Sequence, residues 1–113
     1  MRQKLLTKAI EQAFIKQGYT GDKKPENIKV ICKLFNPAGA GTWWLYERDS
    51  QDPDIFWGFC LLDTPMFAEC GTLRLSELQA LRLPMGLSIE RDSSFDIGEK
   101  TLRQVINEVK GED

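Results

Sequence analysis

The sequence predicts an α+β fold, an antiparallel β-meander of about four to five strands with helices packed on it. Segments rich in β-branched and aromatic residues fill the middle of the chain, and turn-forming residues separate them. Segments with helical periodicity flank this region on both sides. All 113 residues are expected to form a single domain, because one hydrophobic core typically serves about 100–150 residues.

The N-terminal helix is expected over Leu6–Gln17, where Ile10 and Phe14 fall on one face. Thr7 is suited to cap its start, and Gly18 is suited to end it. Four strands follow, each bounded by turn residues. Their expected ranges are Lys29–Phe35, Thr42–Arg48, Ile55–Leu62 and Cys70–Leu75, and residues 86–97 form either a loop or a final edge strand.

Two further helices complete the prediction. Ser76 followed by Gln79 matches the capping-box pattern, which predicts a short middle helix. The C-terminal amphipathic helix is expected over Glu99–Lys110, where apolar residues line one stripe. On its opposite side, Glu99 and Arg103 are spaced to form an i,i+4 ion pair.

Composition argues against several classes of protein. The net charge of −2 and the isoelectric point near 5.2 disfavour a domain whose main partner is duplex DNA, because phosphate contacts need a basic excess. The absence of histidine removes the commonest general base, so we expect no catalytic residues, no metal site and no cofactor. No segment approaches the roughly 20 apolar residues of a membrane span, and the start lacks a signal-peptide core. We therefore expect a cytoplasmic protein.

Two turns resemble ligand-binding loops, and we interpret both as simple turns. The NPAGAG segment at residues 36–41 leads into a predicted strand, whereas a phosphate-binding loop needs a helix after its glycines. The acidic turn at residues 49–54 lacks the glycine and the closing glutamate of an EF-hand loop. Cys32 and Cys60 lie in apolar segments and are expected to be buried thiols.

The density of aromatic residues in the two central strands is the most informative feature. Alternation places Trp43 on one face of the second strand and Trp44 and Tyr46 on the other, and it separates Phe56 from Trp57 in the third. Either helices cover both faces, or one aromatic face is partly open to a partner, as exposed aromatic patches usually mark interaction sites. The candidate partner-binding residues are Trp43, Trp44, Tyr46, Phe56, Trp57, Glu90, Arg91 and Asp92.

Two other functions stay open as alternatives. Tryptophans also stack on single-stranded bases, but the residues beside these tryptophans are largely acidic, and the lysines of residues 23–33 are expected to form a solvated face. Carboxylate pairs, such as Asp63 with Glu69 or Glu90 with Asp92, would suit a small enzyme. Carboxylates are common on any surface, so this pattern favours catalysis only weakly.

Several segments carry a family resemblance: LLTKAIEQAF, KLFNPAGAGTWWLYERD, DIFWGFCLLD and GTLRLSELQALRLPMGLSIERDSSF. Together they resemble an uncharacterised family catalogued as domain of unknown function twenty-nine fifty-eight. The resemblance runs from about Leu5 to Phe95, and the stretch LSELQALRLPMGLSIERD is its most specific part. It implies residence on bacterial plasmids, conjugative elements or phages, and it implies no known reaction.

The setting and the residues together give the expected function. We expect a non-enzymatic accessory protein of a mobile element that binds a protein partner, which is a host-defence or transfer component. The concrete expectation is an inhibitor of the anti-CRISPR or anti-restriction kind. Single-stranded nucleic-acid binding is the first alternative and a carboxylate-dependent enzyme the second; no membrane partner is expected, and a homodimer is left open. Glu90, Arg91 and Asp92 are expected either to fix a loop or to form a recognition edge.

Overall fold

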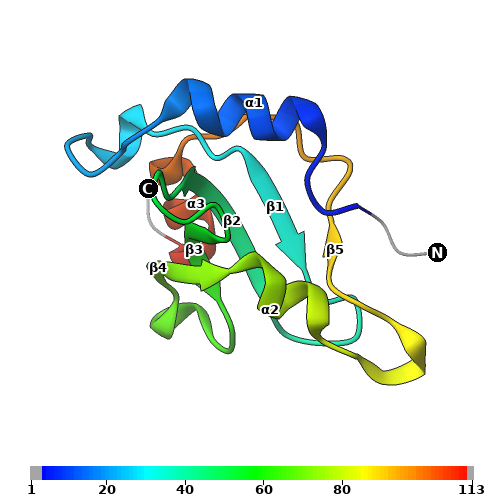
Figure 1. The fold of residues 1–113 in the computed structure, drawn as a ribbon. Coiled ribbons are helices and arrows are strands. Elements are labelled where there is room, and N and C mark those ends of the chain that lie inside the picture. The colour runs from blue at the N-terminus through cyan, green and yellow to red at the C-terminus, as the bar shows by residue number, and fades with distance from the viewer. Residues whose placement is uncertain (1–3, 112–113) are drawn as a thin grey trace.

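The computed structural model describes residues 4–111, which form a five-stranded antiparallel sheet with three α-helices (Figure 1). The strand order β4-β3-β2-β1-β5 confirms the predicted α+β meander. Within residues 86–97, where the sequence allows either a loop or a final edge strand, a two-residue edge strand forms. The helices are α1 (Lys8–Gln17), α2 (Leu75–Ala80) and α3 (Leu102–Lys110). The strands are β1 (Cys32–Phe35), β2 (Thr42–Arg48), β3 (Ile55–Leu61), β4 (Glu69–Arg74) and β5 (Glu90–Arg91), and short 3-10 turns are η1 (Pro25–Asn27), η2 (Pro65–Phe67) and η3 (Pro84–Gly86).

Helices cover both faces of the sheet. On one face, called the α1 face, Trp43 and Phe56 pack with residues of α1 and α2. On the other, called the α3 face, Tyr46 and Phe59 pack with residues of α3, and Trp44 lies partly buried at the margin. The predicted alternation of the aromatic residues is therefore confirmed.

The N-terminal helix has the predicted caps. The Thr7 side chain accepts a hydrogen bond from the N–H of Ile10. Gly18 follows the helix with a φ of 63°, a conformation that favours glycine. The chain then turns at residues 19–21 toward the end of β2, and this loop forms one wall of the site described below.

The first strand begins at Cys32, not at Lys29 as predicted. The residues before it pair with another part of the chain. The N–H of Val30 donates to the carbonyl of Lys100, and Lys29 forms an isolated bridge with Thr101. This segment therefore connects the start of α3 to the sheet instead of extending β1.

The predicted capping box at Ser76 and Gln79 is wrong. Helix α2 begins at Leu75, and no side chain caps its start. The hydroxyl and the backbone N–H of Ser76 instead donate to the carboxylate of Asp54, at 2.6 and 2.9 Å. Because this bond joins α2 to the β2–β3 hairpin, Ser76 acts in tertiary structure and not as a local cap.

A capping box does occur at α3, between Thr101 and Gln104. Glu99 precedes this cap and so lies outside the helix. The predicted Glu99–Arg103 pair does not form among the described residues. None of the helices within residues 4–111 has the length and apolar character that spanning a bilayer requires.

Candidate functional site

A β-bulge in β2 positions the most unusual side chain of the sheet. The register with β3 shifts between Leu45, which lies opposite Gly58, and Glu47, which lies opposite Trp57. Tyr46 is the additional residue. Because directly opposed residues share a face, Glu47 turns to the α3 face beside Trp57, whereas strict alternation would place it on the α1 face.

Helix α1 holds the bulge through Gln17. The side-chain amide of Gln17 donates to the carbonyls of Tyr46 and Lys29, and its oxygen accepts the N–H of Lys29 at 3.0 Å. One side chain thus joins the end of α1, the segment before β1 and the bulge. The orientation of Glu47 follows from this tertiary contact.

Glu47 is a buried carboxylate, with 9% of its surface exposed. Its Oε1 accepts two hydrogen bonds from Thr20, one from the backbone N–H at 2.9 Å and one from the hydroxyl. No other charged side chain of residues 4–111 is buried to this degree. Burial of a carboxylate is unfavourable unless hydrogen bonds or an opposite charge compensate it, and Thr20 supplies only the hydrogen bonds.

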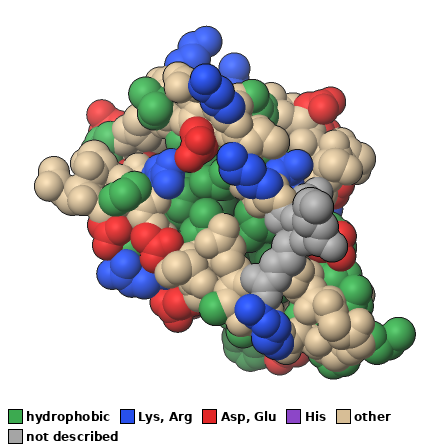
Figure 2. Space-filling view, turned by 45° about the vertical axis from the view of Figure 1, so that its right-hand side comes forward, with side chains coloured by type: hydrophobic (Ala, Val, Ile, Leu, Met, Phe, Trp, Pro, Cys, Tyr) green, Lys and Arg blue, Asp and Glu red, His purple; other side chains and the backbone are tan. Residues whose placement is uncertain are grey.

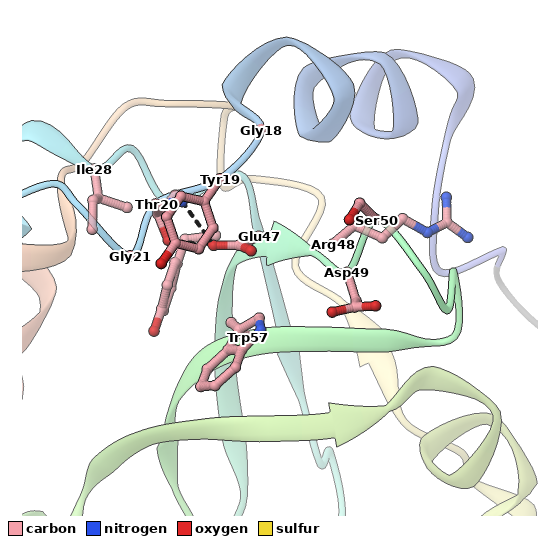
Figure 3. Close-up of a pocket in the computed structure, with 11 residues that line it drawn as sticks. Gly18, Tyr19, Thr20, Gly21, Ile28, Glu47, Arg48, Asp49, Ser50 and Trp57 are labelled. Atoms are coloured by element: carbon pink, nitrogen blue, oxygen red, sulfur yellow. Dashed lines mark hydrogen bonds between the residues drawn. The ribbon is translucent and has the colours of Figure 1, made fainter.

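A hollow of about 480 Å³ opens in front of this carboxylate, between the loop after α1 and the β2–β3 hairpin (Figure 3). Its volume lies in the range of about 300–1,000 Å³ that is usual for ligand sites. Trp57, which is 39% exposed, and the exposed Tyr19 lie at its walls. We call it the Glu47 pocket, and its defining residues are Tyr19, Thr20, Tyr46, Glu47, Asp49 and Trp57.

The charges around the pocket are unequal. Arg48 also lines it, but its guanidinium points away (Figure 3) and lies over the Phe56 ring at 5.1 Å, on the α1 face. Arg48 is further engaged by Glu11 at 3.4 Å and by the Pro53 carbonyl at 2.6 Å. Asp49 adds a second carboxylate to the lining, and its Oδ2 accepts the N–H groups of Gln51 and Asp52 within the turn. The pocket is therefore aromatic and acidic, and it suits binding of a cation better than binding of an anion.

The structure divides the aromatic candidates between core and surface. Trp43, Tyr46 and Phe56 are buried, and Phe56 has no exposed surface. Trp44 is half-buried, with the Lys33 ammonium 5.8 Å from its ring centroid. Trp57 is the most exposed of the five and the one whose side chain reaches the surface at the pocket. The aromatic surface available to a partner therefore narrows to Trp57 and part of Trp44.

The three charged candidates, Glu90, Arg91 and Asp92, lie in and directly after β5, which is the edge strand at the end of the sheet away from β4. Arg91 donates to the backbone carbonyls of Lys4 and Leu5, which ties the N-terminal segment to the edge strand. Asp92 accepts from Ser94 and pairs with Lys33 at 3.3 Å. The Ser94 hydroxyl bond, together with Lys33, lowers the pKa of Asp92. These contacts fix local chain geometry; Glu90 is half-buried in the same strand.

The acidic turn forms a network with α2 and β4. Arg74 pairs with Asp52 at 3.0 Å and with Asp54 at 3.7 Å. The N–H of Asp54 and the Arg74 guanidinium lower the pKa of Asp52, and the Ser76 hydroxyl lowers that of Asp54. Among residues 4–111, no three acidic or cysteine side chains are grouped so that they could hold a metal ion.

All three cysteines are free thiols. Cys32 is buried as expected, Cys60 is half-buried, and Cys70 on the edge strand β4 is exposed. Of the carboxylate pairs considered for catalysis, Asp63 and Glu69 are exposed, and Asp92 is already engaged by Lys33. Neither pair lies in the Glu47 pocket.

Comparisons with known proteins give a family. The chain matches the family described as Protein of unknown function (DUF2958) over residues 5–110, nearly its whole length, and it belongs to this family. Neither the curated proteins nor the solved structures contain a match.

Proposed function

We propose that this DUF2958 protein is a non-enzymatic accessory protein of a bacterial mobile element that acts by binding another protein. Its target is a component of host defence or of transfer, and its concrete role is to inhibit a defence system of the anti-CRISPR or anti-restriction kind. The mobile-element setting comes from the family resemblance, and the binding mode comes from the surface.

The observation that carries the proposal is an apolar patch at the β3–β4 connection. Leu62, Met66 and Phe67 are 59, 76 and 71% exposed, and Leu62 and Phe67 line one hollow. Large apolar side chains gathered on a surface usually mark an interaction site. We call these three residues the β3–β4 patch.

The patch adjoins an open strand edge. β4 is the last strand of the sheet order, so no strand among residues 4–111 pairs with its outer side. The outward backbone groups belong to Cys70 and Thr72, because Gly71 and Leu73 face β3 in the register that continues from the Leu75–Asp54 bond. An extended segment of a partner can pair with such an edge while its side chains contact the patch.

Single-stranded nucleic acid is the second candidate, because Lys16, Lys23 and Lys29 line a separate hollow of about 330 Å³. Base recognition would need aromatic rings beside those lysines. The aromatic rings of Tyr19 and Trp57 instead share the Glu47 pocket with carboxylates. Charges of both signs are also interspersed on the face drawn in Figure 2. These features favour a protein partner.

Affinity capture from bacterial lysate, with and without nuclease, tests the proposal. Wild-type protein should enrich one or more proteins in a nuclease-resistant manner, and the double variant Met66→Ser, Phe67→Ser should lose them. Ile15→Ser is the matched control, because Ile15 is 72% exposed on α1, away from the patch. Light scattering of the purified protein gives its oligomeric state, so a dimer would identify a second copy of this chain as the molecule bound at the β3–β4 patch. Capture of no protein, with single-stranded DNA bound in a steeply salt-dependent manner, would overturn the proposal.

Phage plating tests the anti-defence role. Expression of the chain should raise plating efficiency on a host with an active CRISPR or restriction system, and the patch double variant should not. Unchanged plating across hosts carrying each type of system would contradict that role while leaving protein binding intact.

A further inference from the structure

We propose that the Glu47 pocket binds the guanidinium of an arginine side chain presented by the protein partner. The inference rests on the proposed protein-binding function and names the chemistry that one of its contacts recognises. It starts from the state of the Glu47 carboxylate.

One oxygen of this carboxylate is used and the other is open. Both hydrogen bonds from Thr20 go to Oε1. Oε2 accepts no hydrogen bond from residues 4–111. Every fully buried side-chain oxygen in this part of the chain does have a hydrogen-bond partner. Oε2 must therefore be reached by solvent, and Glu47 meets solvent at the pocket that it lines. The pocket thus presents the Oε2 of Glu47 to an incoming ligand, while the two hydrogen bonds from Thr20 to Oε1 fix the carboxylate in position.

The missing element is a positive charge. No lysine or arginine of the described chain pairs with Glu47. Arg48, the nearest in sequence, is engaged by Glu11 and Pro53 on the α1 side. A charge-assisted hydrogen bond from an incoming cation would complete the carboxylate's partners, and such bonds are roughly twice as strong as neutral ones.

The walls favour arginine over lysine. Trp57 and Tyr19 line the pocket with aromatic side chains. Asp49 adds negative charge to the lining, although its Oδ2 already accepts the N–H groups of Gln51 and Asp52. A planar guanidinium stacks on aromatic faces and bonds to carboxylates at the same time, whereas an ammonium acts as a compact, strongly hydrated charge. Arginine is also enriched among residues that dominate protein–protein binding energy.

Titration with short peptides tests the pocket without the natural partner. The probes are acetyl-Gly-Gly-X-Gly-Gly-amide with X arginine, citrulline or lysine, and the readout is the NMR signal of the Trp57 indole N–H, assigned with Trp57→Phe. The arginine peptide should shift this signal saturably. Citrulline, its neutral isostere, should bind at least about tenfold more weakly, because the charge-assisted bond is lost. The lysine peptide should bind more weakly than the arginine peptide.

Glu47→Gln separates charge from fold, since an amide oxygen still accepts both bonds from Thr20. It should weaken the arginine peptide by about tenfold or more while the amide spectrum stays dispersed. Glu77→Gln is the matched control, because Glu77 is exposed on α2 and outside the pocket. Should Glu47→Gln perturb the fold, Trp57→Leu tests the aromatic wall at a more exposed site. Read at the Thr20 amide, it should also weaken binding of the arginine peptide, because the stacking surface is lost.

Equal binding of the citrulline peptide, unchanged binding by Glu47→Gln, or tighter binding of the lysine peptide would overturn the assignment. The two proposals fail separately. If capture succeeds and the arginine peptide does not bind, protein binding stands and the pocket's role falls. If the peptide binds and capture fails, the pocket's chemistry stands and the proposed function falls.

Discussion

Tyr46 is one residue more than β3 can pair with, and this extra residue decides where the Glu47 carboxylate lies. Thr20 then fixes the carboxylate through two donors on one oxygen. Thr20 and Glu47 lie far apart in sequence, so their contact closes the loop after α1 onto the sheet. The contact stabilises the fold and also orients the Glu47 carboxylate in the pocket. Substitutions at Thr20 test the stabilising role, and Glu47→Gln tests the binding role.

Thr20→Val tests the structural role at this scale. The change removes the hydroxyl donor from a buried, charged acceptor, so the free energy of unfolding should fall by about 1.5–3 kcal/mol. Urea denaturation measures the difference. Thr20→Ser keeps a hydroxyl and should lose much less. A larger loss in Thr20→Ser than in Thr20→Val would show that the methyl group, which valine keeps, carries the stabilisation instead of the hydroxyl.

Gly58→Ala tests how closely β2 and β3 pack. A Cβ on Gly58 would lie 2.9 Å from Leu45 Cδ2 and 3.0 Å from the Trp44 carbonyl oxygen, so the variant should lose about 1–3 kcal/mol of stability. Gly71 lies directly opposite in β4 and has open space around its Cα. Gly71→Ala should therefore change stability by no more than about 0.5 kcal/mol in the same urea measurement. Comparable losses would contradict this packing.

At the scale of elements, local patterns predicted what local physics controls. Alternation located β2 and β3 and placed Trp43 and Trp44 on their correct faces, and Thr7 capped α1 as predicted. The failures involve partners distant in the sequence. Ser76 bonds to Asp54 instead of capping α2, and the residues before β1 pair with the start of α3.

The candidate site was missed for the same reason. Glu47 sits in an alternating aromatic strand, and a carboxylate there was a visible signal. Its face, however, depends on the bulge at Tyr46, which Gln17 supports from α1. No spacing within β2 records that contact. Trp57 was named as a candidate, but the pocket that gives it a role could be recognised only from the structure.

Gln17→Ala tests the connection between α1 and the bulge. It leaves the Tyr46 carbonyl and both backbone groups of Lys29 without a side-chain partner, so stability should fall by about 1–3 kcal/mol, and the Trp57 indole signal should shift. Gln12→Ala on the exposed side of the same helix is the control, and it should do neither. A stable variant with an unmoved Trp57 signal would remove Gln17 from the account of the site.

At the scale of the whole molecule, the buried thiols and the buried tyrosine hydroxyl predict that the folded state loses stability at alkaline pH. Burial raises the pKa of Cys32 from 9.0 to about 12 and that of Cys60 to about 11, and it also raises the pKa of Tyr46. Between pH 9 and 11 the unfolded chain releases protons that the folded chain retains. The free energy of unfolding should therefore fall as pH rises through this window, and these groups should contribute no slope below it.

Urea midpoints at pH 8, 9.5 and 10.5 measure this slope. Cys32→Ala should lower stability at all three pH values, because it leaves a cavity, but it should flatten the slope. A slope that is the same with and without Cys32 would show that its thiol is not protected by folding.

The proposed function is also a property of the whole molecule, because a partner would meet the β3–β4 patch and the β4 edge together. The most direct measurement is the ratio of captured protein between the wild-type chain and the Met66→Ser, Phe67→Ser variant, quantified by mass spectrometry after nuclease treatment. The account predicts at least one protein enriched about tenfold or more by the wild type, since residues at the centre of an interface often contribute more than 1.4 kcal/mol. Ile15→Ser should capture it as the wild type does. Equal capture by the wild type and the patch variant, or enrichment that disappears with nuclease, would contradict it.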